Sequence, residues 1–184
     1  LSVNPNFTFE MIEKYPDKEW NWCWISQTKN LTMEIIEKYS DKPWDWEYIS
    51  GNLNISIEIL EKYNDKPWNW KAISKNSNLT MEIIEKYPDK PWDWKKITYN
   101  ENCFTIELYD KFHDKDWNIY YIAQSFNKIS ELFDKFPNKP WDFTSISNNK
   151  NLKIETIEKY PDKPWDWTYL SHNPNLTLEF IEKN

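Results

Sequence analysis

The sequence predicts an all-α protein, an α-solenoid of 24-residue helix-turn-helix repeats. A tryptophan followed by Asp or Asn recurs every 24 residues, with one step of 25 between Trp92 and Trp117, and a fixed period in this range is typical of repeat arrays. Each period contains two short apolar patterns with helical spacing. Gly51 is the only glycine, which disfavours β-rich folds because their turns often need positive φ. We expect a single array over residues 1–184, about seven and a half units long, with the leading tryptophans Trp20, Trp44, Trp68, Trp92, Trp117, Trp141 and Trp165.

The first helix of each unit, here called helix A, is represented by the stretch that starts at Leu31. Thr32 suits the N-cap because its hydroxyl can accept a hydrogen bond from a backbone N–H group of the first turn. Leu31 before this cap and Ile36 four residues after it can form a hydrophobic staple. Ile35, Ile36 and Tyr39 are spaced by three and four residues, so we expect them to share the buried face.

A second short helix, helix B, is expected after each leading tryptophan. The next residue is always Asp or Asn, and a position restricted to these two types is typical of an N-cap. In the second unit this interpretation places the cap at Asp45 and puts Trp46 and Ile49 on one face. The alternative starts the helix at Pro43, with proline in the first position. The seven candidate caps are Asn21, Asp45, Asn69, Asp93, Asn118, Asp142 and Asp166.

The units between about Asn100 and Lys153 depart from the consensus, and we expect the irregular part of the array there. This range begins with the one-residue insertion. Further along, Ile129 stands where helix A expects threonine, so Ser130 or Asn127 is the candidate cap. Lys153 occupies the same position in the next unit.

The two ends of the chain match the interior of a unit. Leu1-Ser2 corresponds to the end of a helix B, and Lys183-Asn184 lies inside or just after a helix A. The sequence therefore predicts a piece of a longer array that begins and ends in mid-unit. Neither end has the polar cap repeat that solenoids usually need, so end-to-end self-association is expected to be possible.

Composition disfavours several functions. All 23 basic residues are lysine and the net charge is −7, which weighs against nucleic acid as the main partner because arginine is its usual reader. A chain with one glycine has no Gly-rich phosphate loop. His113 and His172 lie in different units without a nearby cysteine, so they do not form a metal-ligand set. The glutamate pairs recur in identical surroundings, unlike catalytic pairs. We therefore predict no enzyme: no catalytic residue, no cofactor and no metal.

The cysteine pattern and hydropathy suggest a compartment. Cys23 and Cys103 lie more than three repeats apart, which is too far for a disulfide in a solenoid and favours reduced thiols in the cytosol. No apolar run approaches the roughly 20 residues of a membrane span. The expected localisation is therefore cytoplasmic, with no membrane partner.

The tryptophans admit two interpretations. In the first they fill the seams between units as a structural ladder. In the second they form an exposed aromatic track that stacks nucleic-acid bases, beside a row of lysines. The lysine row is matched by a neighbouring row of aspartates, which weakens this alternative. The lysine row consists of Lys18, Lys42, Lys66, Lys90, Lys115, Lys139 and Lys163.

The two residues after the second aromatic position vary most from unit to unit. Constant positions make the scaffold, whereas variable ones contact a specific partner or only water. If they bind, the aromatic members are the expected anchors and the lysines form a basic patch. The predicted partner is a protein of unknown identity, and the candidate contact residues are Trp24, Tyr48, Lys71, Lys95, Lys96, Tyr120, Tyr121 and Tyr169.

The tandem pattern also resembles repeats in hypothetical proteins of giant DNA viruses that infect amoebae and other protists. The resemblance is plainest at Pro164-Trp165-Asp166-Trp167 and Asn173-Pro174-Asn175-Leu176-Thr177, and the unit around Trp117 is the poorest match. It covers essentially the whole chain, but implies no activity, cofactor or binding residue. It implies a viral origin, which agrees with the absence of arginine, and a location in the host cytoplasm or the virion.

Overall fold

The computed structural model describes residues 6–52 and 54–183, and in these ranges it contains fifteen α-helices and no strand. The predicted all-α class is confirmed. The predictions for Leu1, Ser2 and Asn184 lie outside the described residues. The A helices are α1 (Phe9–Lys14), α3 (Met33–Lys38), α5 (Ile57–Lys62), α7 (Met81–Lys86), α9 (Ile106–Lys111), α11 (Ile129–Lys135), α13 (Ile154–Lys159) and α15 (Leu178–Lys183). The B helices are α2 (Trp22–Ile25), α4 (Trp46–Asn52), α6 (Trp70–Ile73), α8 (Trp94–Thr98), α10 (Ile119–Ser125), α12 (Phe143–Ser147) and α14 (Trp167–Leu170).

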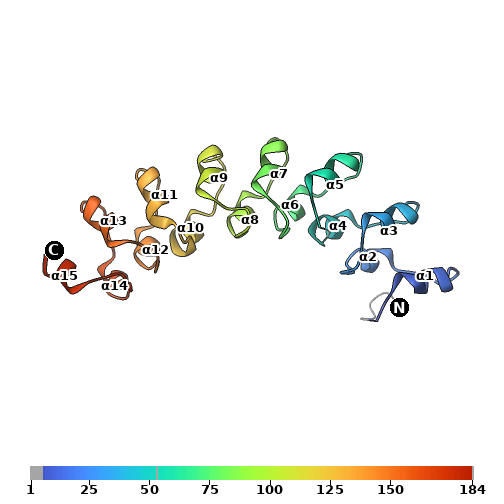
Figure 1. Cartoon of the computed structure of the whole chain (residues 1–184), viewed down its shortest axis with the longest axis horizontal. Coiled ribbons are helices and arrows are strands. Elements are labelled where there is room, and N and C mark those ends of the chain that lie inside the picture. The colour runs from blue at the N-terminus through green and yellow to red at the C-terminus, as the bar shows by residue number, and fades with distance from the viewer. Residues whose placement is uncertain (1–5, 53, 184) are drawn as a thin grey trace. The chain divides into compact units, whose positions relative to one another are not determined.

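The chain divides into an N-terminal block that ends at Cys103 and a C-terminal block that begins at Phe104. Within the N-terminal block, α3, α5 and α7 lie in one row and α4, α6 and α8 in a second row (Figure 1). The C-terminal block repeats this arrangement, with α12 packed between α10 and α14. Each block is therefore a helical repeat solenoid, in which short helices are stabilised mainly by their neighbours.

The A helices α3, α5, α7 and α9 begin with the predicted N-cap bond, whereas Thr8 makes no such bond at α1. The Thr32 hydroxyl accepts a hydrogen bond from the Ile35 N–H at 3.4 Å, and the equivalent serine and threonines of α5, α7 and α9 do the same. The predicted buried face is only partly right. Met33 and Ile36 are buried, whereas Ile35 and Tyr39 are half-buried. The buried face of α3 therefore consists of Met33 and Ile36, which are three residues apart.

The B helices begin at the second aromatic position. Asp45 Oδ1 accepts hydrogen bonds from the Glu47 and Tyr48 N–H groups at 3.0 and 3.3 Å, and α4 starts at Trp46. The N-cap interpretation is therefore confirmed, and the alternative start at Pro43 is wrong. Other caps accept comparable bonds, namely Asn21, Asn69, Asp93, Asn118 and Asp166.

Three consecutive helices in the irregular part, α11, α12 and α13, have no N-cap bond from a side chain. The predicted caps Ser130 and Asn127 are wrong, because Lys128 occupies the N-cap of α11 and Ser130 lies inside the helix. The Ser130 hydroxyl instead accepts a hydrogen bond from the Lys153 N–H at 2.8 Å. It thus joins α11 to the next unit.

Candidate protein-interaction face

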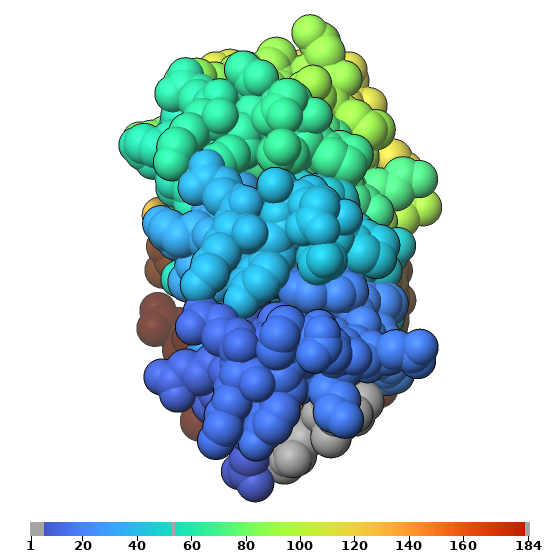
Figure 2. All heavy atoms as spheres, turned by 90° about the vertical axis from the view of Figure 1, so that its right-hand side faces the viewer, coloured from blue at the N-terminus to red at the C-terminus, as the bar shows by residue number. Residues whose placement is uncertain are grey.

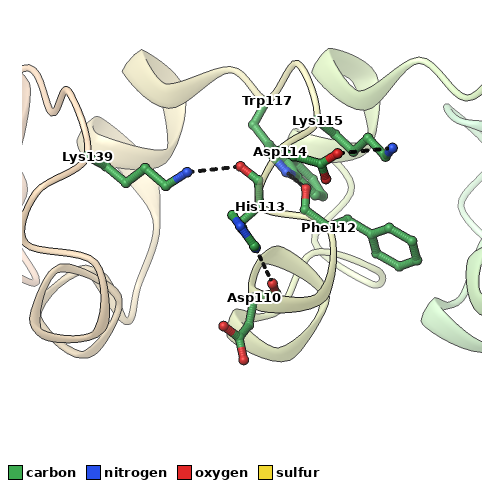
Figure 3. A network of polar contacts seen from close by, with 7 residues as sticks. All are labelled: Asp110, Phe112, His113, Asp114, Lys115, Trp117 and Lys139. Atoms are coloured by element: carbon green, nitrogen blue, oxygen red, sulfur yellow. Dashed lines mark hydrogen bonds and ion pairs between the residues drawn. The ribbon is translucent and has the colours of Figure 1, made fainter.

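The leading tryptophans fasten the turn between helices A and B. Each indole Nε1–H donates a hydrogen bond, 2.7 to 3.0 Å long, to the carbonyl oxygen five residues earlier, on the residue that follows helix A. Figure 3 shows this arrangement at Trp117 and Phe112. A carbonyl at the end of a helix has no partner within that helix. Sequence reasoning missed this bond because it depends on the shape of the turn.

The same rings fill the seams between units. Trp44 packs edge-on against Trp22 of the preceding unit with ring centroids 5.0 Å apart, and Trp70 meets Trp92 at 5.1 Å. The leading tryptophans from Trp68 onward are at most 9% exposed, and Trp20 and Trp44 are half-buried. Rings in this position lack the open faces that stacking on bases requires.

A buried serine at the end of several B helices ties its unit to the next. The Ser74 hydroxyl donates to the Trp70 carbonyl at 2.8 Å and accepts from the Asp93 N–H at 2.9 Å. Ser74 is fully buried, as are Ser26, Ser50 and Ser147. The signal in the sequence was the Ile-Ser pair that recurs in four of the units. The counterparts that bond the next cap N–H are Ser26, Ser50 and Ser147.

Asparagines of the return loop, the segment between helix B and helix A of the next unit, form a second link between units. The Asn76 amide donates to the Ser50 carbonyl at 3.1 Å, and the Asn100 amide donates to the Asn76 carbonyl at 2.8 Å. In the C-terminal block, Asn149 and Asn173 bond the preceding loop in the same way. The side chains of these asparagines thus hold neighbouring loops together.

The lysine row that could have supported nucleic-acid binding makes local contacts. Lys42 and Lys66 pair with the adjacent aspartates at 2.8 and 3.0 Å. Lys139 donates to the His113 carbonyl at 3.1 Å (Figure 3), and Lys163 donates to the Pro137 carbonyl at 3.2 Å. The ammonium groups of Lys139 and Lys163 thus join neighbouring turns.

The candidate partner-binding residues lie on the outer side of the B helices. Trp24, Tyr48, Tyr120 and Tyr169 are 40 to 58% exposed. Lys71, Lys95 and Lys96 are exposed and Tyr121 is half-buried. All follow the second aromatic position in the first turn of helix B, where the cap holds the backbone. We call this set of eight side chains, five in the N-terminal block and three in the C-terminal block, the B-helix face. In the N-terminal block it runs from aromatic residues on α2 and α4 to lysines on α6 and α8.

The structure adds two residues to this face that the sequence did not single out. Lys75 and Tyr99 lie in the return loops and, with Lys96, line a groove of about 490 Å³. The Lys96 ammonium lies 6.0 Å from the centre of the Tyr99 ring. Their position, the residue after the constant serine or threonine, also varies between units, and that variation is the signal that could have identified them.

The histidines and thiols have surroundings that suit structural roles. The His113 ring nitrogen lies 2.8 Å from the Asp110 carbonyl (Figure 3). Desolvation and the Asp45 carboxylate raise the pKa of the exposed Cys23 thiol, and burial raises the pKa of Cys103 to about 12. A raised pKa leaves less of the nucleophilic thiolate at neutral pH.

Two features are absent from the part of the chain that the structure describes. Within residues 6–52 and 54–183, no three His, Cys, Asp or Glu side chains gather in a way that could hold a metal ion. In the same ranges, no helix is both long enough and apolar enough to cross a membrane. Comparisons of the chain with protein-family models, with curated proteins and with solved structures found no match.

Proposed function

We propose that this chain is a non-enzymatic helical repeat scaffold that binds another protein through the B-helix face. The proposal rests on one observation: the leading tryptophans and the isoleucine or leucine near the end of each helix B are buried or half-buried, whereas most of the variable residues are exposed on the B helices. Exposed tryptophan and tyrosine are the residue types that most often anchor protein interfaces. Rigid repeats with a variable outer surface suit such a role.

The composition of the face indicates the kind of partner. Trp24 and Tyr48 offer apolar rings with a polar edge, and Lys71, Lys95 and Lys96 offer positive charge in the next two units. A partner surface with apolar pockets beside carboxylates matches this order, because opposite charges across an interface fix the register of binding.

The test compares proteins captured by the full chain and by variants. The double variant Trp24→Ala/Tyr48→Ala should lose a partner that the unchanged chain captures. Tyr15→Ala is the matched control, because Tyr15 is an equally exposed aromatic residue beside α1, away from the B-helix face. The proposal fails if the double variant and the control capture the same proteins in the same amounts.

Nucleic-acid binding is a second candidate function. It is favoured by the exposed lysines Lys71, Lys75, Lys95 and Lys96, of which Lys75 and Lys96 line a groove with Tyr99. It is disfavoured by the burial of the leading tryptophans. Titration with a single-stranded oligonucleotide at several salt concentrations separates the two. An affinity that falls steeply with salt and is lost in Lys95→Ala/Lys96→Ala would replace the protein-binding proposal.

A further inference from the structure

The return loops that follow α6 and α8 border a groove in the N-terminal block. Units of this block, coloured from blue to green, stack directly on one another in Figure 2. The Asn100 amide donates to the Asn76 carbonyl at 2.8 Å and the Asn102 amide donates to the Ser77 carbonyl at 3.0 Å, so the two loops are held side by side. We call this groove of about 490 Å³ the return-loop groove, and its lining includes Lys75, Ser77, Lys96, Tyr99, Glu101 and Asn102.

The side chains at this groove differ from those of the preceding return loops. Lys75 and Tyr99 each follow the serine or threonine near the end of a helix B, where the two preceding units have Gln27 and Gly51. The Tyr99 ring is 45% exposed. The Lys96 ammonium lies 6.0 Å from the ring centre, a distance at which a cation and an aromatic ring attract each other. The groove therefore combines an accessible aromatic ring with ammonium groups.

The surroundings of the groove are positive, although the chain as a whole has a net charge of −7. Helices α6 and α8 contain three lysines and no acidic residue, and Lys75 follows α6 in the return loop. The Asp93 carboxylate next to α8 accepts the backbone N–H of Lys96 at 3.0 Å. Glu101 is the one carboxylate among the described residues that line the groove. A local excess of positive charge on a negative molecule directs anionic ligands to this place.

The lining favours a peptide over nucleic acid as the anionic ligand. Lysine ammonium groups act as separate point charges and lack the planar fork with which arginine binds phosphate, so they suit carboxylates spaced along a peptide. The Glu101 carboxylate repels the closely spaced phosphates of nucleic acid, whereas a peptide can place an uncharged residue beside it. The exposed Ser77 adds a hydroxyl that can bond to a peptide backbone.

We propose that the return-loop groove binds an acidic peptide segment of the partner protein, in which an apolar side chain is flanked by carboxylates. The apolar side chain packs on the Tyr99 ring, and the carboxylates pair with Lys75 and Lys96. The groove has the volume of a small-ligand site, so the bound segment is short. This inference rests on the proposed function, because it states the chemistry of the partner that the scaffold binds.

The test is a fluorescence-anisotropy titration of the full chain with a labelled peptide in which one leucine is flanked on both sides by glutamates. A second peptide has glutamine in place of each glutamate and should bind about tenfold more weakly. Lys75→Ala/Lys96→Ala should weaken binding of the glutamate peptide about tenfold, since it removes two ion pairs. The matched control is Lys29→Ala/Lys150→Ala, which removes the same charge from exposed lysines of other return loops and should bind like the unchanged chain.

Two single substitutions locate the peptide in the groove. Glu101→Gln should strengthen binding of the glutamate peptide about threefold, because it removes a repulsive charge. Tyr99→Ala should weaken binding of both peptides, because it removes the surface for the leucine. The proposal is overturned if the two peptides bind equally well, or if the control double variant loses as much affinity as Lys75→Ala/Lys96→Ala. It is also overturned if an oligothymidylate binds more tightly than the glutamate peptide and depends on the same two lysines, which indicates nucleic acid.

Failure of this proposal is distinguishable from failure of the protein-binding scaffold. If Trp24→Ala/Tyr48→Ala loses a captured protein but the two peptides bind the unchanged chain equally well, the B-helix face stands and the groove proposal is overturned. If the glutamate peptide binds as expected but Trp24→Ala/Tyr48→Ala captures the same proteins as Tyr15→Ala, the groove proposal is supported and the aromatic anchors of the B-helix face are not.

Discussion

Replacing Ser74 by alanine isolates the contribution of the buried serine link. The substitution removes the hydroxyl that accepts the Asp93 N–H at 2.9 Å and donates to the Trp70 carbonyl at 2.8 Å. The Trp70 carbonyl also accepts the Ser74 backbone N–H at 2.9 Å, so it remains bonded. The main loss is therefore the acceptor of the Asp93 N–H at the start of α8.

The expected loss of stability in Ser74→Ala follows from these contacts. A buried N–H group left without an acceptor costs about 1 to 3 kcal/mol, and the half-buried position of Asp93 points to the lower part of that range. Alanine recovers up to about 0.5 kcal/mol through its higher helix propensity. We expect Ser74→Ala to lower the free energy of unfolding by about 1 to 2 kcal/mol.

Ser171→Ala provides a matched control within the chain. Ser171 occupies the same repeat position and donates to a carbonyl of its own helix at 2.7 Å, but it is exposed. Its replacement should change the free energy of unfolding by less than about 0.5 kcal/mol. The difference between the two changes in the free energy of unfolding measures the contribution of the hydrogen bond between Ser74 and Asp93.

Urea denaturation gives the global effect, and hydrogen exchange gives the local one. Repeat arrays can unfold in more than one step, so exchange of the Asp93 amide is the sharper readout. It should exchange faster in Ser74→Ala than in the unchanged chain. Equal destabilisation by Ser74→Ala and Ser171→Ala, with unchanged Asp93 exchange, would refute the reasoning.

Three further substitutions test other contacts. Trp92→Phe removes the N–H bonded to the Tyr87 carbonyl at 2.9 Å and should lower the free energy of unfolding in urea by about 1 to 3 kcal/mol. Tyr109→Phe removes a buried hydroxyl without a hydrogen-bond partner and should raise it by about 1 kcal/mol. Burial raises the pKa of Tyr109 to about 12, so its protonated phenol favours the folded state. The resulting loss of stability as pH rises from 10 to 12 should be smaller in the variant. The Ser56 hydroxyl and backbone N–H lower the pKa of Glu58 below its usual 4.5. Its contribution is therefore present above pH 4.5 and lost as pH falls further, so thermal unfolding of Glu58→Gln should depend less on acid pH.

For each of these substitutions, one outcome would contradict the prediction. Trp24→Phe alters an exposed ring, so an effect equal to that of Trp92→Phe would mean that the buried N–H contributes nothing. A Tyr109→Phe chain that is less stable than the unchanged one would show that the hydroxyl has a partner. For Glu58→Gln, an unchanged acid profile would exclude a stabilising role for the carboxylate bonded to Ser56.

The caps of both helices could be predicted because each depends on residue type at one position. Thr32 and Asp45 bond N–H groups only two or three residues ahead, so their roles need no knowledge of the neighbouring unit. Exposure of the variable positions could likewise be expected, since residues in a packed seam cannot vary freely. The choice between Asp45 and Pro43 needed the structure, because both starts satisfy the same local preferences.

The contacts between units could not be predicted with the same certainty. Ser74 is a small polar residue next to a loop, a pattern equally typical of an exposed turn, and only the position of Asp93 in the next unit reveals its role. The prediction that Ser130 caps α11 was wrong for the same reason, since its hydrogen-bond partner Lys153 lies one unit away. The partner of the B-helix face stays a prediction.

Most hydrogen bonds between neighbouring units run in one direction; the Cys23 thiol, which donates forward to Asp45, is an exception. The cap N–H groups, the loop asparagine amides and the lysine ammonium groups donate from the later unit to acceptors in the earlier one. During synthesis on the ribosome, each unit therefore emerges after the carbonyl and hydroxyl groups that it will bond. The array can fold vectorially, one unit at a time, with the nascent N-terminal units serving as the template on which the next unit docks.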